Sequence, residues 1–136
     1  MNRRLYQVPA HQLNAYQMVE KTTITGRDTE ARVLTQCAIK LKHCKENWNA
    51  KDRKVKLDEA LRYNQKVWSL IQGDILDNNN PLPKNIRNDI LSLSAFLDKR
   101  IFNIMAYPAP EKLNIVIDIN LNIAAGLRSS AAISQA

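Results

Sequence analysis

The five prolines of this 136-residue chain fall in only three places, and this spacing limits the chain to long uninterrupted segments. They are Pro9, the pair Pro81 and Pro83, and the pair Pro108 and Pro110. Only three glycines add to them. Because Pro and Gly are the strongest interruptions of regular structure, so few of them favour a few long helices over many short strands. We therefore expect an all-α fold, a small bundle of four to five helices joined by loops rich in Pro and Asn.

Apolar residues recur at steps of three and four in three segments, as they do on one face of an amphipathic helix. The segment from about 28 to 48 carries Val33 or Leu34, Cys37, Ala38, Leu41, Cys44 and Trp48. The segment from about 53 to 76 carries Leu57, Ala60, Leu61, Val67, Trp68, Ile71 and Ile75. The segment that follows Pro83 carries Ile86, Ile90, Leu93, Leu97, Ile101 and Ile104. The sequence therefore predicts a helix over each.

Several signals mark where these helices begin and end. The stretch from Thr22 to Gly26 is rich in poor helix formers, and we expect it to end a short helix over about 10–21. Asp28 is a plausible N-cap for the next helix. Pro83 suits an early helical position because its missing N–H has no partner there. Residues 1–12 are expected to form a flexible basic leader, 13–128 the helical domain and 129–136 a frayed tail.

The segment 114–123 fits two templates, so periodicity alone does not assign it. Its alternating apolar residues are typical of a half-buried strand: Ile115, Ile117, Ile119, Leu121 and Ile123. The helical template also fits, through Leu113, Val116 or Ile117, Asn120, Ile123 or Ala124, and Leu127. A lone strand leaves its backbone unpaired. Pro110 and Glu111 make a good helix opening and Gly126 a fair end signal, so we favour a helix.

Three polar side chains, Asn64, Asn120 and Arg87, interrupt the predicted helical faces or their starts. A buried amide costs about 1–3 kcal/mol when it is unpaired, so both Asn side chains need partners. Asn64 is expected to tie two helices together by bonding a loop carbonyl or Asn120. Arg87 is expected to anchor the loop before it, through carbonyls or Asp89, or else to meet an acidic or carbonyl-rich spot on a partner.

The net charge is +7, and most of it lies in one stretch. Between residues 40 and 56, seven basic residues stand against Glu46 and Asp52, a net charge of +5. The basic residues of this patch are Lys40, Lys42, Lys45, Lys51, Arg53, Lys54 and Lys56. One interpretation is a solvated helix end with cations near its C-terminus. The other is a surface that attracts a phosphate backbone or an acidic protein. Trp48 lies within this stretch, although a core or groove position is favoured over base stacking.

The sequence contains no clear pattern of catalytic or metal-binding residues. Cys37 and Cys44 are seven residues apart on one predicted helix, which separates their Cα atoms by about 10 Å, too far for a disulfide. We expect both in the core, since a metal site at His43 and Cys44 lacks further ligands. We see no paired carboxylates, phosphate-binding Gly loop or metal-ligand spacing. We expect no enzymatic activity, no catalytic or metal-binding residue and no cofactor.

No run approaches the roughly 20 apolar residues that a membrane span needs, and the amino end has no apolar signal-peptide core. We therefore expect a cytoplasmic protein that does not insert into a membrane.

The order of the motifs resembles the FlaF family of flagellar proteins over about residues 13–128. The matching runs are Ala15-Tyr16, Gly26-Arg27 with Glu30-Ala31 and Leu34, Glu59-Ala60-Leu61 with Asn64 and Trp68, Asn80-Pro81-Leu82-Pro83 with Ile86-Arg87, Ile90, Leu93 and Phe96, and Leu113, Ile117, Ile119-Asn120, Ile123 and Gly126-Leu127. Within them Asn64, Trp68, Pro83, Asn120 and Gly126 are the structural residues of the pattern. No single run is specific, but their combination in this order and spacing is.

The resemblance implies a non-enzymatic helical protein that binds flagellin, supports its synthesis and export for filament assembly, and acts with the regulator FlbT. A flagellin-binding secretion chaperone is the favoured function. Candidate partner-binding residues are Leu91, Phe96, Met105, Pro81, Leu82 and Arg87, together with the first helix. The alternative is an RNA-linked post-transcriptional regulator of flagellin mRNA that uses the basic patch beside FlbT. A purely structural adaptor is a third hypothesis.

Overall fold

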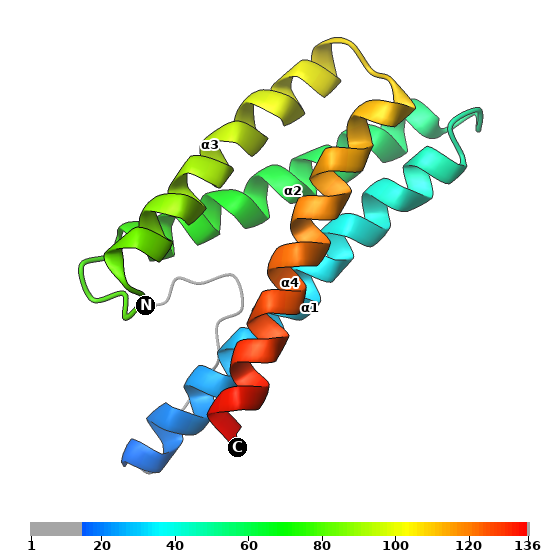
Figure 1. The fold of residues 1–136 in the computed structure, drawn as a ribbon. Helices are drawn as coiled ribbons and strands as arrows, with labels where there is room; N and C mark the ends of the chain where they lie inside the picture. Colours follow the sequence, from blue (N-terminus) through cyan, green and yellow to red (C-terminus); the bar gives the residue numbers. More distant parts are fainter. Residues whose placement is uncertain (1–14, 136) are drawn as a thin grey trace.

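Four α-helices and one short 3-10 helix build the fold seen in the computed structural model, which describes residues 15–135 and, for side chains, residues 26–129 (Figure 1). The helices are α1 (Ala15–Glu46), α2 (Arg53–Leu76), α3 (Lys84–Ala106), η1 (Pro110–Lys112) and α4 (Leu113–Gln135). The described part of the chain contains no strand. The expected all-α bundle is confirmed. The predicted leader over 1–12 lies outside the described residues.

The helices form two antiparallel pairs. α4 packs mainly on α1, and α3 packs mainly on α2. Both pairs come together at the end of the molecule that holds the connections 47–52 and 107–112, and they diverge toward the opposite end (Figure 1). Where all four helices meet, their apolar stripes bury one another. Beyond that junction each pair forms an arm of two helices.

The core follows the predicted stripes closely. On α1 the buried residues are Leu34, Cys37, Ala38, Leu41 and Cys44, and on α2 they are Leu57, Ala60, Leu61, Val67, Trp68 and Ile75. α3 contributes Leu97, Ile101 and Ile104, and α4 contributes Leu113, Val116, Ile117 and Ala124. The N-terminal half of α3 is less covered, because Ile86 is 40% exposed and Ile90 and Leu93 are half-buried. This half lies on the α2–α3 arm, where neighbours are fewer.

The predicted break between Thr22 and Gly26 is wrong, because α1 runs unbroken from Ala15 to Glu46. Helix propensity is a weak bias of about 1 kcal/mol or less per residue, and tertiary packing overrides it. Gly26 has open space around the position where a Cβ would stand and does not adopt a left-handed conformation. Asp28 is not an N-cap; it lies inside α1 and accepts a hydrogen bond from Arg32 one turn later.

The ambiguous segment 114–123 is helical, so the favoured assignment is confirmed. The alternating isoleucines arise because apolar residues cover more than half of the circumference of α4. Gly126 does not end the helix, which continues to Gln135. The fraying predicted for 129–136 stays a prediction.

The loop 77–83 ends α2 as predicted, and short polar side chains hold it. Asn80 Nδ2 donates to the carbonyl of Asp74 at 3.0 Å, and Asn80 Oδ1 accepts from the N–H of Leu82 at 3.0 Å. Asp77 Oδ1 accepts from the N–H of Asn79 at 2.8 Å. Such bonds from Asn and Asp to nearby backbone are typical of tight turns. Pro83 stands immediately before α3, one position earlier than predicted.

Candidate functional site

A buried polar network lies at the junction of the two helix pairs. Asn120 Nδ2 donates to Asn64 Oδ1 at 2.7 Å, and Trp68 Nε1 donates to Asn120 Oδ1 at 2.8 Å. Asn64 Nδ2 donates to the carbonyl of Ala60 at 2.8 Å and to that of Cys37 at 3.3 Å. The network therefore ties α2 to both α1 and α4. The predicted contact of the two Asn side chains is confirmed, whereas the role of the Trp68 N–H was not predicted.

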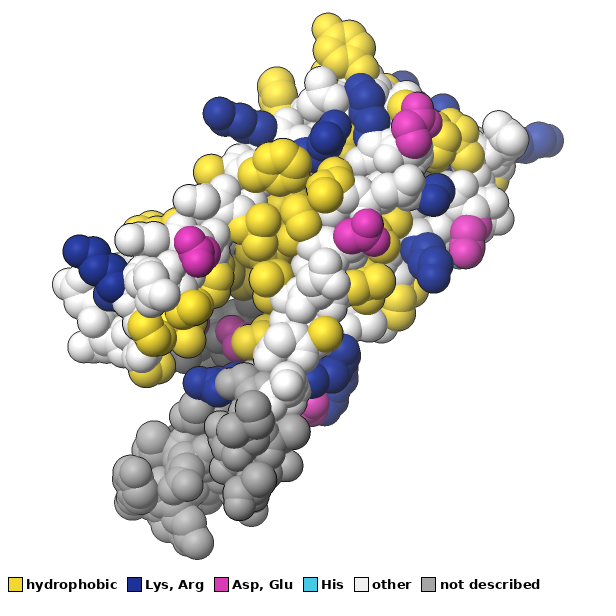
Figure 2. All heavy atoms as spheres, viewed as in Figure 1, with side chains coloured by type: hydrophobic (Ala, Val, Ile, Leu, Met, Phe, Trp, Pro, Cys, Tyr) yellow, Lys and Arg dark blue, Asp and Glu magenta, His cyan; other side chains and the backbone are white. Residues whose placement is uncertain are grey.

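A cleft opens between α3 and α4 on the side of the junction where the two arms diverge. Figure 2 shows apolar side chains gathered between these helices and a hollow toward the open end. Ser94 and Asp98 mark the α2 side of α3, because both accept hydrogen bonds from Gln72, at 2.5 and 3.2 Å.

One flank of α3 borders this cleft. Ile86, Ile90 and Leu93 lie on the same side of Ser94 as Leu97 and Ile104, which are buried in the core where α3 meets α4. Toward the end where the two arms diverge, α4 lies farther from α3 (Figure 1). Ile86 is 40% exposed there, whereas Ile90 and Leu93 remain partly buried against the core.

The facing wall of the cleft is one flank of α4. Arg128 marks the α1 side of this helix, because it donates to Thr35. At about 100° per residue, Ile119 and Ile123 lie roughly 140–180° around the helix from Arg128 and so face away from α1. Ile119, Ile123 and Leu127 are partly buried against the core. The alternating isoleucines were the sequence signal for this flank: a helix so widely apolar has more apolar surface than one packing partner covers.

The residues predicted to bind a partner do not form one surface. Leu91 and Met105 are half-buried, whereas Phe96 is 42% exposed. Leu91 and Phe96 are five residues apart on α3, so their side chains leave the helix about 140° apart. Pro81 is exposed and Leu82 half-buried in the loop before α3. Partner binding by these residues stays a prediction, and the proposal below uses instead the flanks of α3 and α4 that border the cleft.

Arg87 does not anchor the loop before α3. Its Nε is buried, and among the described residues it has no hydrogen-bond partner. The backbone N–H of Arg87 donates to the carbonyl of Pro83 at 3.0 Å, as the first turn of α3 requires. Among the described residues the loop is fixed by bonds from Asn80 and not by the Arg87 side chain. The alternative role of Arg87, contact with a partner, stays a prediction.

The basic patch covers the end of α1, the connection 47–52 and the start of α2, at the opposite end of the molecule from the open side of the cleft (Figure 1). A cationic side chain lies over each of the two aromatic rings beside this patch. Arg53 lies over the ring of Trp48 at 4.2 Å from the centroid, and Lys40 over the ring of Tyr63 at 4.9 Å. Trp48 also packs against the core, in agreement with the favoured interpretation of this residue.

Both cysteines are free and buried, as predicted. Burial raises the pKa of the Cys37 thiol from 9.0 to about 12, and nearby Lys40 opposes this only in part. Burial also raises the pKa of Cys44, with the negative charges of Asp52 and Glu59 acting in the same direction. Because the thiolate is the reactive form, both thiols are poor nucleophiles in the folded protein.

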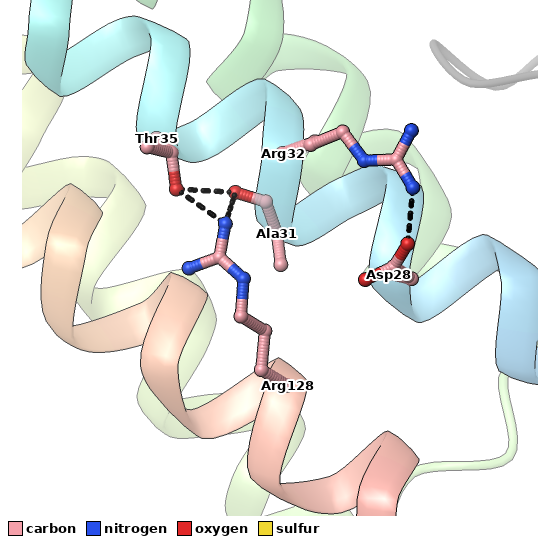
Figure 3. A network of polar contacts seen from close by, with 5 residues as sticks. All are labelled: Asp28, Ala31, Arg32, Thr35 and Arg128. Carbon is pink, nitrogen blue, oxygen red and sulfur yellow. Dashed lines mark hydrogen bonds and ion pairs between the residues drawn. The ribbon is translucent and has the colours of Figure 1, made fainter.

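The α1–α4 arm is held by a polar contact that no sequence pattern predicted. Arg128 Nη2 donates to Thr35 Oγ1 at 2.8 Å, and it lies 3.5 Å from the carbonyl oxygen of Ala31 (Figure 3). Thr35 Oγ1 itself donates to that carbonyl at 2.8 Å. The Arg32–Asp28 pair lies one turn away on α1 (Figure 3). The arm is therefore fixed by an inter-helix hydrogen bond that lies beyond Ala124, the last residue of α4 seen to be buried among those whose side chains the structure describes.

No group of three or more His, Cys, Asp or Glu residues among the described residues is arranged to hold a metal ion. None of the described helices has the length and apolar character needed to cross a membrane.

Comparison with known proteins identifies a family. No curated protein and no solved structure matches the chain. The family model described as "Flagellar protein FlaF" matches residues 12–127, which is most of the chain and includes the four-helix junction, the network and both walls of the cleft. The chain therefore belongs to the FlaF family of flagellar proteins.

Proposed function

We propose that this flagellar protein is a non-enzymatic cytoplasmic chaperone that binds unassembled flagellin and holds one of its amphipathic terminal helices in the cleft between α3 and α4. The observation that carries the proposal is the pair of apolar flanks on α3 and α4 that border the cleft, with no other described helix lying between them (Figure 1). On α3 this flank includes Ile86, which is 40% exposed, and on α4 it includes the partly buried Ile123.

The cleft has the chemistry that helix-in-groove recognition needs. An amphipathic helix presents apolar side chains at three- and four-residue steps, which match the spacing of the residues on each wall. Covering apolar surface contributes about 25 cal/mol per Å², so binding is driven mainly by the hydrophobic effect. No charged side chain is needed in this contact. Binding in the cleft is therefore expected to tolerate salt, because screening acts on exposed charges.

The cleft also fits a chaperone better than a permanent subunit. A flagellin helix bound in the cleft is shielded from other flagellin molecules. Because only the flanks of α3 and α4 contact it, it can still be released for export. FlbT is the expected regulatory partner.

Calorimetric titration with monomeric flagellin, at low and at high salt, tests the proposal. We expect saturable binding with one flagellin per chain and an affinity that changes little with salt. A flagellin truncated at both terminal helical regions is the matched control and is expected not to bind. No heat with intact flagellin, or equal binding of the truncated form, contradicts the proposal.

A further inference from the structure

The basic end of the molecule carries several exposed lysines for which no ion pair is seen among the described residues. Elsewhere on α1 and α2, arginines pair with carboxylates one turn away, as in Arg32 with Asp28 and Arg62 with Asp58. Within the basic patch only Lys56 approaches a carboxylate, that of Glu59 at 4.0 Å. Among the described residues, no ion pair involves Lys42, Lys45, Lys51 or Lys54, and all four are exposed.

The fold concentrates this charge. The patch carries seven basic and two acidic residues, a net charge of +5 out of +7 for the whole chain. α1 and α2 are antiparallel neighbours joined by the short connection 47–52, so lysines from both helices and from the connection share one end of the molecule. Lys and Arg side chains are visible at this end in Figure 2, at the upper right. Such a concentration of one sign of charge attracts polyanions over about a Debye length.

We propose that this end is a second binding surface, separate from the cleft, and that it binds the phosphate backbone of a nucleic acid without reading its bases. The composition of the patch favours this partner over an acidic protein. Six of the seven basic residues are lysines, which are depleted in protein–protein interfaces but are common phosphate ligands. The single Arg53, whose planar group suits carboxylates and phosphates alike, is stacked on Trp48.

The aromatic residues at this end explain why base readout is not part of the proposal. Stacking on bases requires an open aromatic face beside positive charge. Trp48 is half-buried and has Arg53 over its ring, and Tyr63 is half-buried with Lys40 over its ring. Neither ring is a free platform. The lysines alone remain for contact, and they contact phosphates whatever the base sequence.

Fluorescence anisotropy with a labelled single-stranded RNA and a labelled duplex DNA of unrelated sequence tests this inference with the full chain. We expect both to bind at low salt, and the logarithm of the affinity to fall linearly with the logarithm of salt concentration. The triple variant Lys42→Gln, Lys45→Gln, Lys51→Gln is expected to bind at least about tenfold more weakly. Its salt slope is expected to be lower by about 2 to 3, because each lost phosphate contact removes about 0.7–0.9.

A matched triple variant separates a local surface from overall charge. Lys66→Gln, Lys84→Gln and Lys99→Gln remove the same charge from exposed positions on α2 and α3 outside the patch. We expect this variant to bind nucleic acid as the natural chain does, and circular dichroism to show that both variants are folded. Equal weakening by the two triples overturns the inference, and so does the absence of salt-dependent binding.

Competition decides between nucleic acid and an acidic protein. Unlabelled RNA is expected to displace the labelled RNA at much lower charge concentration than poly-glutamate does. Equal displacement by poly-glutamate overturns the assignment to phosphate. The outcome is independent of the chaperone proposal, because the patch variant is expected to keep its affinity for flagellin in the calorimetric titration.

Discussion

Asn120 Nδ2 donates a hydrogen bond to Asn64 Oδ1 at 2.7 Å, which joins α4 to α2 across the centre of the four-helix junction. The same Asn120 side chain accepts the indole N–H of Trp68, so both polar atoms of its amide are occupied. All three side chains are fully buried. In a core of this kind a polar network has one arrangement that pairs every group, so it fixes how the two helix pairs are set against each other. The cleft begins beside this junction, and its geometry depends on that setting.

Removing the Asn120 amide is expected to destabilise the protein strongly. In Asn120→Ala, Asn64 Oδ1 and Trp68 Nε1 both lose a partner inside the core. At about 1–3 kcal/mol for each of these two unsatisfied buried groups, the free energy of unfolding is expected to fall by about 2–6 kcal/mol. Urea denaturation measures this change in the free energy of unfolding. Asn122→Ala, an exposed change on the same helix, is the control and is expected to stay within about 0.5 kcal/mol.

A double-mutant cycle tests whether the two Asn side chains act as a pair. Asn64→Ala and Asn120→Ala remove opposite ends of one hydrogen bond, so their effects on the free energy of unfolding are expected not to add. A coupling energy of about 1–3 kcal/mol is expected. Additive effects within about 0.3 kcal/mol contradict a direct bond.

The glycines of α1 and α4 test the continuity of both helices. Gly26 and Gly126 lie inside helices, have open space for a Cβ and do not adopt left-handed conformations. Gly26→Ala and Gly126→Ala are each expected to raise the free energy of unfolding by about 0.5–1 kcal/mol, since Ala loses less conformational entropy in a helix. Thermal denaturation followed by circular dichroism measures this. Destabilisation by either change indicates a helix end at that glycine.

The sequence predicted the helices whose stripes are regular and failed where local propensity opposed tertiary packing. The bounds of α2 follow from its apolar spacing and from the Asn and Pro residues after it, so pattern and punctuation agree there. At Thr22–Gly26 the local preference is against helix, but it is too small to break α1 once the neighbouring turns are helical. Whether such a segment is helical depends on the packing of the whole fold, and this packing cannot be read from a single sequence.

The candidate site was harder to predict than the core, because both are apolar stripes in the sequence. Ile86 and Ile104 occupy the same stripe of α3, yet one is 40% exposed and the other is fully buried. The difference arises from the divergence of the two arms, which depends on how far α4 stays beside α3. The predicted contact between Arg87 and the loop before α3 is not seen for a related reason. The sequence shows which groups are near one another along the chain, but not which atoms form a hydrogen bond.

The buried thiol of Cys37 makes stability depend on pH above the neutral range. Its pKa is raised from 9.0 to about 12 in the folded protein, so the folded state holds the proton more tightly than the unfolded state. This contribution is fully present below about pH 9, and it is lost as the pH rises toward about 12. Urea denaturation at pH values from about 8 to 10.5 is expected to show falling stability, and the decline is expected to be smaller in Cys37→Ala.

The reactivity of the same thiols provides a second readout. Neither cysteine is expected to react appreciably with Ellman's reagent in the native protein near pH 8, and both are expected to react in guanidinium. Rapid native reaction, or an equal pH dependence of stability in Cys37→Ala, contradicts the deep burial of Cys37.

Charge placed in the cleft is expected to prevent flagellin binding. Ile86 borders the cleft and is 40% exposed, so Ile86→Glu puts a carboxylate on the α3 wall at little cost in folding. We expect at least about a tenfold loss of affinity for flagellin, because the carboxylate must be desolvated on binding. Val55→Glu is the matched control, since Val55 is 59% exposed on α2 at the other end of the molecule. Calorimetric titration compares the two variants, and equal affinities refute the assignment of the cleft.

Hydrogen–deuterium exchange of the chain, alone and saturated with monomeric flagellin, shows where on the fold flagellin docks. We expect flagellin to slow exchange in the less covered half of α3, over about 84–93, and in α4 over about 119–127. We expect little change over 40–56. Slowing confined to 40–56, or the absence of change in both walls of the cleft despite saturation, contradicts the proposal that flagellin docks between α3 and α4.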